Sequence, residues 1–159
     1  AGSYDLWLPG ESVIGSGTGF LYPTETTTLT IPSTAAKVIS VGAYNAAFNS
    51  YAAFSGRGFT RMEHRIKPDL AAPGVNIISA APGGDYQTVT GTSFATPFVS
   101  GAAALLMEWG IVRGNDPYLY SEKVKAYLIR GTKKLPAFTE YPNPYIGWGT
   151  LCTADSIPT

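Results

Sequence analysis

The residue best placed for chemistry in this chain is a serine at the boundary between a predicted strand and a predicted helix. Residues 91–97 read Gly-Thr-Ser-Phe-Ala-Thr-Pro, and Ser93 is the third of them. At a helix start, free backbone N–H groups and the positive end of the helix dipole would surround its hydroxyl. Such a serine is suited to nucleophilic attack, since its own N–H can stabilise a developing oxyanion. Ser93 is therefore the candidate nucleophile. Gly91 and Thr92 are candidate positioning residues for the oxyanion, although Thr92 is equally open as a simple helix cap.

The helix that would carry this serine is predicted from the long apolar segment after it. Residues 98–109 contain no Pro and a single Gly, so a helix should run from the serine to about Trp109 and end at Gly110. Thr92 or the serine itself would cap it, and Pro97 would fall in the first turn, where no intrahelical donor is needed. The segment is apolar on most sides, which predicts a buried central helix. Its small residues, among them Gly101, predict close packing against a sheet.

The chain before the serine indicates short strands separated by turns. Residues 37–44 form a near-continuous apolar run, which favours a strand buried on both faces, as in a parallel sheet. Residues 75–80 and 86–90 predict two more strands, with Pro-Gly-Gly-Asp at residues 82–85 as the turn between them. The last of these strands leads directly into the serine motif.

The C-terminal part predicts two further helices. Residues 121–130 form an amphipathic pattern that Gly131 stops. The side chains expected to face inward are Val124, Leu128 and Ile129, and those expected to face outward are Lys123, Lys125 and Arg130. A short helix is expected at the end of residues 147–157.

Residues 1–30 are predicted to be an extended or inserted segment, separate from the main body at residues 31–159. Residues 3–8 alternate in the manner of a strand, and residues 20–30 are Thr-rich and extended. The segment suggests an extra hairpin or part of an inserted binding subdomain. It has neither the basic start nor the apolar core of a signal peptide, and no Met precedes Ala1.

Composition narrows the possible partners. The formal net charge is zero and only 14% of residues are charged, which disfavours nucleic acid and acidic membranes as partners. The low charge also suggests that much of this surface is buried against something. Cys152 is the single cysteine, which excludes an internal disulfide, and no apolar run reaches membrane-spanning length.

The serine motif resembles the active-serine signature of the subtilisin-like serine proteases. Several flanking segments resemble that family in the same order along the chain: residues 38–43, 54–58, 67–75 and 147–149. The resemblance covers roughly residues 30–157 and is closest to the clostridial branch, which includes the spore-germination proteases. It implies an α/β fold, part of a parallel, doubly wound three-layer sandwich. It also implies hydrolysis of peptide bonds in a protein or peptide substrate, and favours a secreted, cell-surface or spore-associated location.

The rest of the family's catalytic machinery is missing from this sequence. A nucleophilic serine needs a base within hydrogen-bond reach, oriented by a third group. The family's His-Gly-Thr-His-type motif, its orienting Asp and its oxyanion Asn all lie upstream of the serine, and none has a counterpart here. His64, the only histidine, stands among charged residues and is expected in a loop. The chain therefore resembles the C-terminal portion of a catalytic domain, with the N-terminal portion as its partner. It could be a truncated chain, a processed one or a degenerate relative.

Three other features leave alternatives open. In many relatives, the position of Asp69 holds an acid that binds a cation, near the carbonyls of residues 35–41. Calcium needs about six to eight oxygen ligands, so a structural aspartate is favoured over a calcium ligand. No cofactor is predicted. Cys152 is expected to be a buried, inert thiol. The basic residues at 57–67 predict a solvated loop or a docking site for an acidic segment. At the level of the whole protein, the rival to the protease is an inert pseudoprotease or interaction scaffold.

Overall fold

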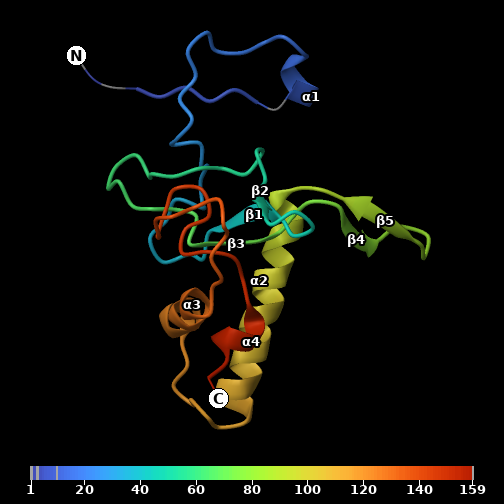
Figure 1. Ribbon diagram of the computed structural model, residues 1–159, viewed down its shortest axis with the longest axis vertical. Coiled ribbons are helices and arrows are strands. Elements are labelled where there is room, and N and C mark those ends of the chain that lie inside the picture. The colour runs from blue at the N-terminus through green and yellow to red at the C-terminus, as the bar shows by residue number, and fades with distance from the viewer. Residues whose placement is uncertain (1, 3, 10, 159) are drawn as a thin grey trace.

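The computed structural model describes residues 2, 4–9 and 11–158 of the chain, apart from the side chains of residues 11 and 12. A long helix, α2, runs along much of the molecule, with a small sheet beside its start and helix α3 alongside it (Figure 1). The N-terminal segment lies at the opposite end of the molecule from the C-terminus.

The central sheet has the strand order β2-β1-β3. β1 (Val41–Asn45) runs parallel to β3 (Leu70–Pro73), and the short β2 (Ser50–Tyr51) is antiparallel to the end of β1. The strand predicted over residues 37–44 therefore forms from residue 41 onward, and its parallel pairing is confirmed. Together with α2, which packs on both strands, the parallel pair confirms the predicted α/β class.

The C-terminal segment returns to the other edge of β3. Thr150 pairs in parallel with Ala71 through an isolated bridge. Gly147 makes this return possible, because it has a φ of +58° and a side chain there would collide with the carbonyl oxygen of Pro68. The chain then forms the short helix α4 (Thr153–Ser156), as predicted.

The two strands predicted before the serine motif form a hairpin that projects from the body (Figure 1). β4 (Ile77–Ala80) and β5 (Tyr86–Val89) are antiparallel, with the predicted turn between them. Their outer side chains are open to solvent, with Ile78 75% and Tyr86 78% exposed. The hairpin leads the chain into α2.

α2 (Thr92–Met107) continues into a π-helical turn, η1 (Glu108–Val112), so the predicted stop at Gly110 is wrong. Gly110 lies inside the π-helical turn, where an added Cβ would approach Leu119 Cδ2 to 2.9 Å. The N–H of Asp116 also donates to the Gly110 carbonyl oxygen. This glycine therefore permits close approach of the returning chain and does not act as a left-handed helix cap.

Only one face of α2 is buried in the described chain. The buried positions recur at helical spacing and pack against residues of β1 and β3: Ala95, Val99, Ala102 and Leu106. On the two flanks of this stripe, large apolar side chains stay exposed, among them Phe98 and Leu105 on one side and Met107 on the other. The predictions of burial on most sides and of close packing at Gly101 are both wrong here, since a Cβ on Gly101 would meet nothing within 4 Å.

α2 and η1 together form the one helix in the described part of the chain that could cross a membrane by length and composition. The span Thr92–Val112 has 21 residues and a mean hydropathy of 1.3, whereas the sequence analysis found no run of that length. The core helix of a soluble protein can have the same length and composition. Packing of α2 on β1 and β3 accounts for its buried apolar stripe.

α3 has the predicted bounds (Ser121–Arg130) and ends at Gly131. The three residues expected inside are all at least partly buried: Val124, Leu128 and Ile129. Lys125 differs from the prediction. Its side chain is only 18% exposed and turns inward to pair with Asp69.

Between residues 4 and 30 the described chain contains a single helical turn, α1 (Glu11–Ile14), and no strand. The strand predicted over residues 3–8 is therefore wrong for residues 4–8, and Ser3 lies outside the described residues. The segment is extended but forms no hairpin, because no neighbouring strand is there to pair with it. Several of its large apolar side chains are exposed: Tyr4, Leu6, Leu21 and Tyr22.

Candidate active site

Ser93 is the second residue of α2, and its side chain is exposed at the start of the helix. The predicted cap at Thr92 or Ser93 is wrong: Gly91 is the N-cap residue, and no side chain caps the helix. Pro97 is the sixth residue of the helix, one turn later than expected, so the Ser93 carbonyl lacks its usual intrahelical donor. Among the described residues, the N–H of Ser93 also has no partner, as expected for a first-turn donor.

Two glycines fix the turn that leads into Ser93. The N–H of Gly91 donates to the carbonyl oxygen of Gly74 at 2.8 Å, which ties the helix start to the end of β3. An added Cβ on Gly74 would lie 2.7 Å from the Ala43 Cβ, so the close approach requires glycine at that position. Gly91 itself has a φ of +154° and a ψ of 161°, angles that side-chain-bearing residues rarely adopt.

A cleft of about 740 Å³ opens beside Ser93. Its walls come from the start of α2, the segment before β1, and two stretches at residues 24–33 and 53–57. Many of the lining side chains carry a hydroxyl: Thr24, Thr28, Thr30, Ser33, Ser40, Ser55, Thr92, Ser93 and Thr96. The cleft therefore offers hydrogen-bonding groups to a bound molecule on several sides.

An arginine holds one wall of this cleft in place. The Nε of Arg57 donates to the Tyr51 hydroxyl at 3.0 Å, and its NH1 lies 3.3 Å from Oε2 of Glu25. Its guanidinium also stacks over the rings of Tyr51 and Tyr145, at 5.2 and 5.3 Å from their centroids. The hydrogen bond to Tyr51 raises the pKa of Arg57, with Glu25 acting in the same direction. The predicted solvated loop is therefore wrong at Arg57, whose side chain is 21% exposed.

Ser40 is a second cleft residue with an unusual environment. The residue is 2% exposed, and within the described chain its buried hydroxyl has no hydrogen-bond partner. Its backbone N–H is satisfied by Oδ2 of Asp69 at 2.7 Å. A buried hydroxyl without a partner carries a desolvation cost.

No base stands beside Ser93 within the described residues. His64 is exposed in the loop at residues 61–64, packs near Phe59 with ring centroids 6.1 Å apart, and does not line the cleft. It is thus a loop residue, as expected. Nor does any described side chain share a hydrogen bond with the Ser93 hydroxyl.

The remaining predicted residues lie apart from Ser93. Asp69 is buried and paired with Lys67 and Lys125, in agreement with a structural aspartate. Lys67 is itself buried, so the solvated-loop prediction is wrong there too. The described residues contain no cluster of three or more His, Cys, Asp or Glu that could hold a metal. Cys152 is half-buried just before α4, where full burial within a helix was expected.

Sequence reasoning missed Glu25, Ser40 and Arg57 as cleft residues. No local pattern singles them out, because they come from three separate segments that meet only in the folded chain. The basic stretch at residues 57–67 was the single available signal, and it did not separate Arg57 from its exposed neighbours Arg61 and Arg65.

The sequence comparisons identify one family. The profile of the subtilase family matches residues 15–149. The chain is 37% identical over 151 residues to the serine protease AprX of Bacillus subtilis (strain 168), covering 82% of this chain and 32% of that protein. It is 45% identical over 82 residues to a subtilisin of Bacillus pumilus, covering 52% of this chain and 27% of that protein.

Solved structures agree with the sequence matches. The CspB protease of Clostridium perfringens superposes with a TM-score of 0.83 at 52% identity, covering 87% of this chain and 29% of that one. The prenylagaramide maturation protease PagA gives a TM-score of 0.66 at 32% identity, covering 84% of this chain and 46% of that one. The chain thus has a subtilisin-like α/β fold, and it spans about a third or less of the length of the relatives AprX, subtilisin and CspB.

Proposed function

Because the chain belongs to the subtilase family, we propose that it is the part of a serine endopeptidase that carries the nucleophile, Ser93. The observation that supports this most is the position of Ser93. It stands exposed in the first turn of α2, beside a cleft of about 740 Å³, with its own N–H unpaired among the described residues.

In this proposal, Ser93 Oγ attacks the carbonyl carbon of the scissile peptide bond and forms an acyl-enzyme. The Ser93 N–H, at the positive end of the α2 dipole, donates to the oxygen on which negative charge develops. Thr92 and Gly91 position that turn. The proton of the serine hydroxyl must pass to a base and then to the leaving amine.

The base, its orienting acid and the oxyanion Asn are proposed to lie on an upstream portion of the same catalytic domain. Two observations support this: the described residues place no base beside Ser93, and the chain spans 32% of AprX and 29% of CspB. A hydroxyl without a base is a weak nucleophile, so the chain by itself is proposed to be inactive.

The cleft beside Ser93 is the proposed place for a substrate side chain. Its hydroxyl-rich lining favours a side chain that can hydrogen-bond, and the paired Glu25 and Arg57 close one side of it.

An inert pseudoprotease or interaction scaffold remains the second candidate. It is favoured by the same lack of a base among the described residues, because the serine motif alone could persist as a structural turn. The two candidates differ in whether Ser93 becomes reactive when the upstream portion is present.

Labelling with a fluorophosphonate, which reacts with activated serines, tests the proposal. The chain alone should label poorly, and addition of the upstream portion of the same gene product should restore labelling and peptide hydrolysis. Ser93→Ala should abolish both, whereas Ser100→Ala, an exposed serine two turns along the same helix, should change neither. Failure of the complete protein to label would favour the scaffold. Robust Ser93-dependent hydrolysis by the chain alone would mean that a base within it, such as His64, had gone unrecognised.

A further inference from the structure

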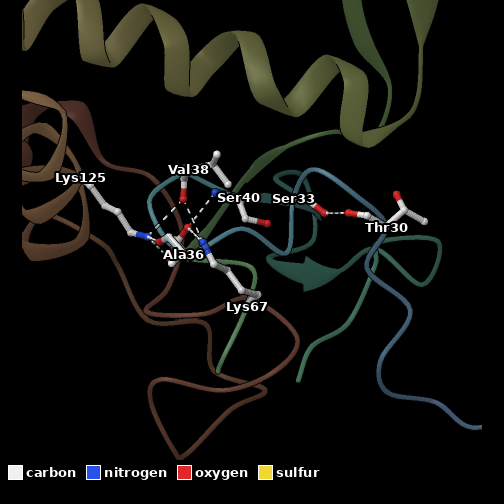
Figure 2. A network of polar contacts seen from close by, with 8 residues as sticks. Thr30, Ser33, Ala36, Val38, Ser40, Lys67 and Lys125 are labelled. Atoms are coloured by element: carbon white, nitrogen blue, oxygen red, sulfur yellow. Dashed lines mark hydrogen bonds and ion pairs between the residues drawn. The ribbon is translucent and has the colours of Figure 1, made fainter. Parts of the chain in front are cut away.

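A compact cluster of oxygen atoms lies where Lys125 reaches toward the segment before β1 (Figure 2). The backbone carbonyls of Ala36 and Val38 and both carboxylate oxygens of Asp69 converge there. Carbonyl and carboxylate oxygens are the ligands that hard metal cations prefer. Asp69 is buried, with 7% of its side chain exposed, so its charge must be compensated locally.

Two lysine ammonium groups occupy the centre of this cluster. Lys67 Nζ lies 2.7 Å from Asp69 Oδ2 and 2.9 Å from the Val38 oxygen. Lys125 Nζ, reaching in from α3, lies 2.6 Å from Asp69 Oδ1, 3.2 Å from the Val38 oxygen and 3.4 Å from the Ala36 oxygen. Every oxygen of the cluster therefore contacts at least one ammonium nitrogen.

We propose that Lys67 and Lys125 serve as built-in cations, so that this oxygen cluster is complete without a metal ion. A structural calcium ion at Asp69, left open by the sequence, does not fit. Calcium takes about six to eight oxygen ligands, and here it would have to share four oxygens with two positive charges.

The charge balance specifies what would replace a missing lysine. The pair of ammonium groups and the single carboxylate carry a net charge of +1. Removal of the Lys125 ammonium leaves the Ala36 carbonyl and Asp69 Oδ1 without a partner and the Val38 carbonyl with Lys67 alone, at a net charge of zero. A monovalent cation restores both the contacts and the charge, whereas a divalent one adds a further positive charge beside Lys67. Burial already lowers the pKa of Lys67, and the charge of Lys125 acts in the same direction.

The two lysines have different roles in this arrangement. The side chain of Lys67 is 2% exposed and lies three residues before the start of β3, so it belongs to the core of the fold. Lys125 is 18% exposed and connects α3 to the segment that carries Ser40 into the cleft wall. Lys125 is therefore the position at which an external cation could enter after substitution.

The experiment compares Lys125→Met with Lys123→Met in the protein as it is encoded. Lys123 is a matched control, because it lies on the same helix and pairs with a carboxylate, Asp116, but contacts no backbone carbonyl. The melting temperature of each is measured in choline chloride, KCl and CaCl₂ at equal ionic strength. Choline is too large to enter the cluster, whereas K⁺ is close to an ammonium group in size.

The Lys125→Met variant should melt lower than the unaltered protein in choline chloride and recover by several degrees in KCl, as a ligand that binds only the folded state requires. CaCl₂ should give a smaller recovery, and Lys123→Met should show no specific response to K⁺. Folding of Lys125→Met only in KCl would support the proposal as well.

The proposal is overturned if Lys125→Met responds to K⁺ no more than Lys123→Met, or fails to fold in every salt. It is also overturned if a chelator destabilises the unaltered protein and Asp69→Asn removes that effect. None of these outcomes depends on proteolytic activity.

Discussion

At the scale of single residues, the turn into Ser93 depends on the backbone conformation of Gly91. Its φ of +154° is rarely adopted by residues with a side chain, while an added Cβ would meet Phe94 no closer than 3.5 Å. Conformational strain, and not lack of space, should therefore oppose substitution. Gly91→Val should lower the free energy of unfolding by about 1–3 kcal/mol. Thr88→Val, in the exposed strand β5, should change it by about 0.5 kcal/mol or less. Equal melting temperatures for the two variants would contradict this.

Two buried serines of the cleft wall should respond differently to loss of the hydroxyl. Ser55 Oγ accepts a hydrogen bond from the N–H of Ala43 at 2.9 Å, whereas Ser40 Oγ has no partner in the described chain. Ser55→Ala should cost about 1–3 kcal/mol, because it leaves a buried donor unpaired. Ser40→Ala should be neutral or stabilising, since it removes an unpaired polar group. Denaturant unfolding of both variants tests this. A similar loss of unfolding free energy in Ser40→Ala would show that the Ser40 hydroxyl is hydrogen-bonded.

At the scale of secondary-structure elements, one ion pair joins the turn after η1 to α3. Lys123 Nζ lies 2.6 Å from Asp116 Oδ1, and Tyr127 donates to Oδ2 at 3.3 Å. The hydrogen bond from Lys123 lowers the pKa of Asp116, and Asp116 in turn raises the pKa of Lys123.

These shifts predict the pH dependence of stability. The contribution of Asp116 is present above its ordinary pKa and is lost as pH falls through its lowered folded-state pKa. That of Lys123 is present below its ordinary pKa and is lost as pH rises through its raised folded-state pKa. Asp116→Asn should flatten both limbs of a plot of melting temperature against pH, and Lys123→Met should do the same. An unchanged acid limb in Asp116→Asn would show that the pair does not form in solution.

At the scale of the whole molecule, the flanks of the buried stripe of α2 and the N-terminal segment leave large apolar side chains exposed. Leu105 and Met107 are 49% and 48% exposed, and Leu21 and Tyr22 are 91% and 94% exposed. Extensive exposed apolar surface marks an interface or an aggregation site. The chain alone should therefore self-associate, and the upstream portion should convert it into a discrete complex. Size-exclusion chromatography with light scattering measures both.

A charge introduced at Leu105 tests whether the same apolar surface of α2 causes both self-association of the chain and its assembly with the upstream portion. Leu105→Glu should make the chain alone less prone to self-association and should weaken its assembly with the upstream portion, with loss of fluorophosphonate labelling. Gln87→Glu, on the exposed strand β5, should do neither. A monomeric chain whose assembly tolerates Leu105→Glu would show that α2 is not covered in the complete protein.

The local elements and the candidate nucleophile could be predicted from the sequence alone. The apolar run before residue 45, the hairpin at residues 77–89 and the amphipathic α3 with its Gly131 stop were all predictable, because hydrophobic period and turn residues are local signals. The position of Ser93 at a strand-to-helix boundary was predictable for the same reason, since the change in pattern occurs within a few residues.

Which polar groups meet could be seen only in the folded chain. Glu25 and Arg57 are 32 residues apart, and Lys125 lies 87 residues from the Val38 carbonyl that it contacts. A lysine on the outer side of a helical pattern is normally placed in solvent. Here a buried carboxylate just before a distant strand turns it inward. The continuation of the helix through Gly110 also depends on a distant contact. A glycine is needed there because Leu119 packs against it, and an added Cβ would leave too little space. Such contacts depend on where distant segments arrive in space, and hydrophobic period carries no information about that.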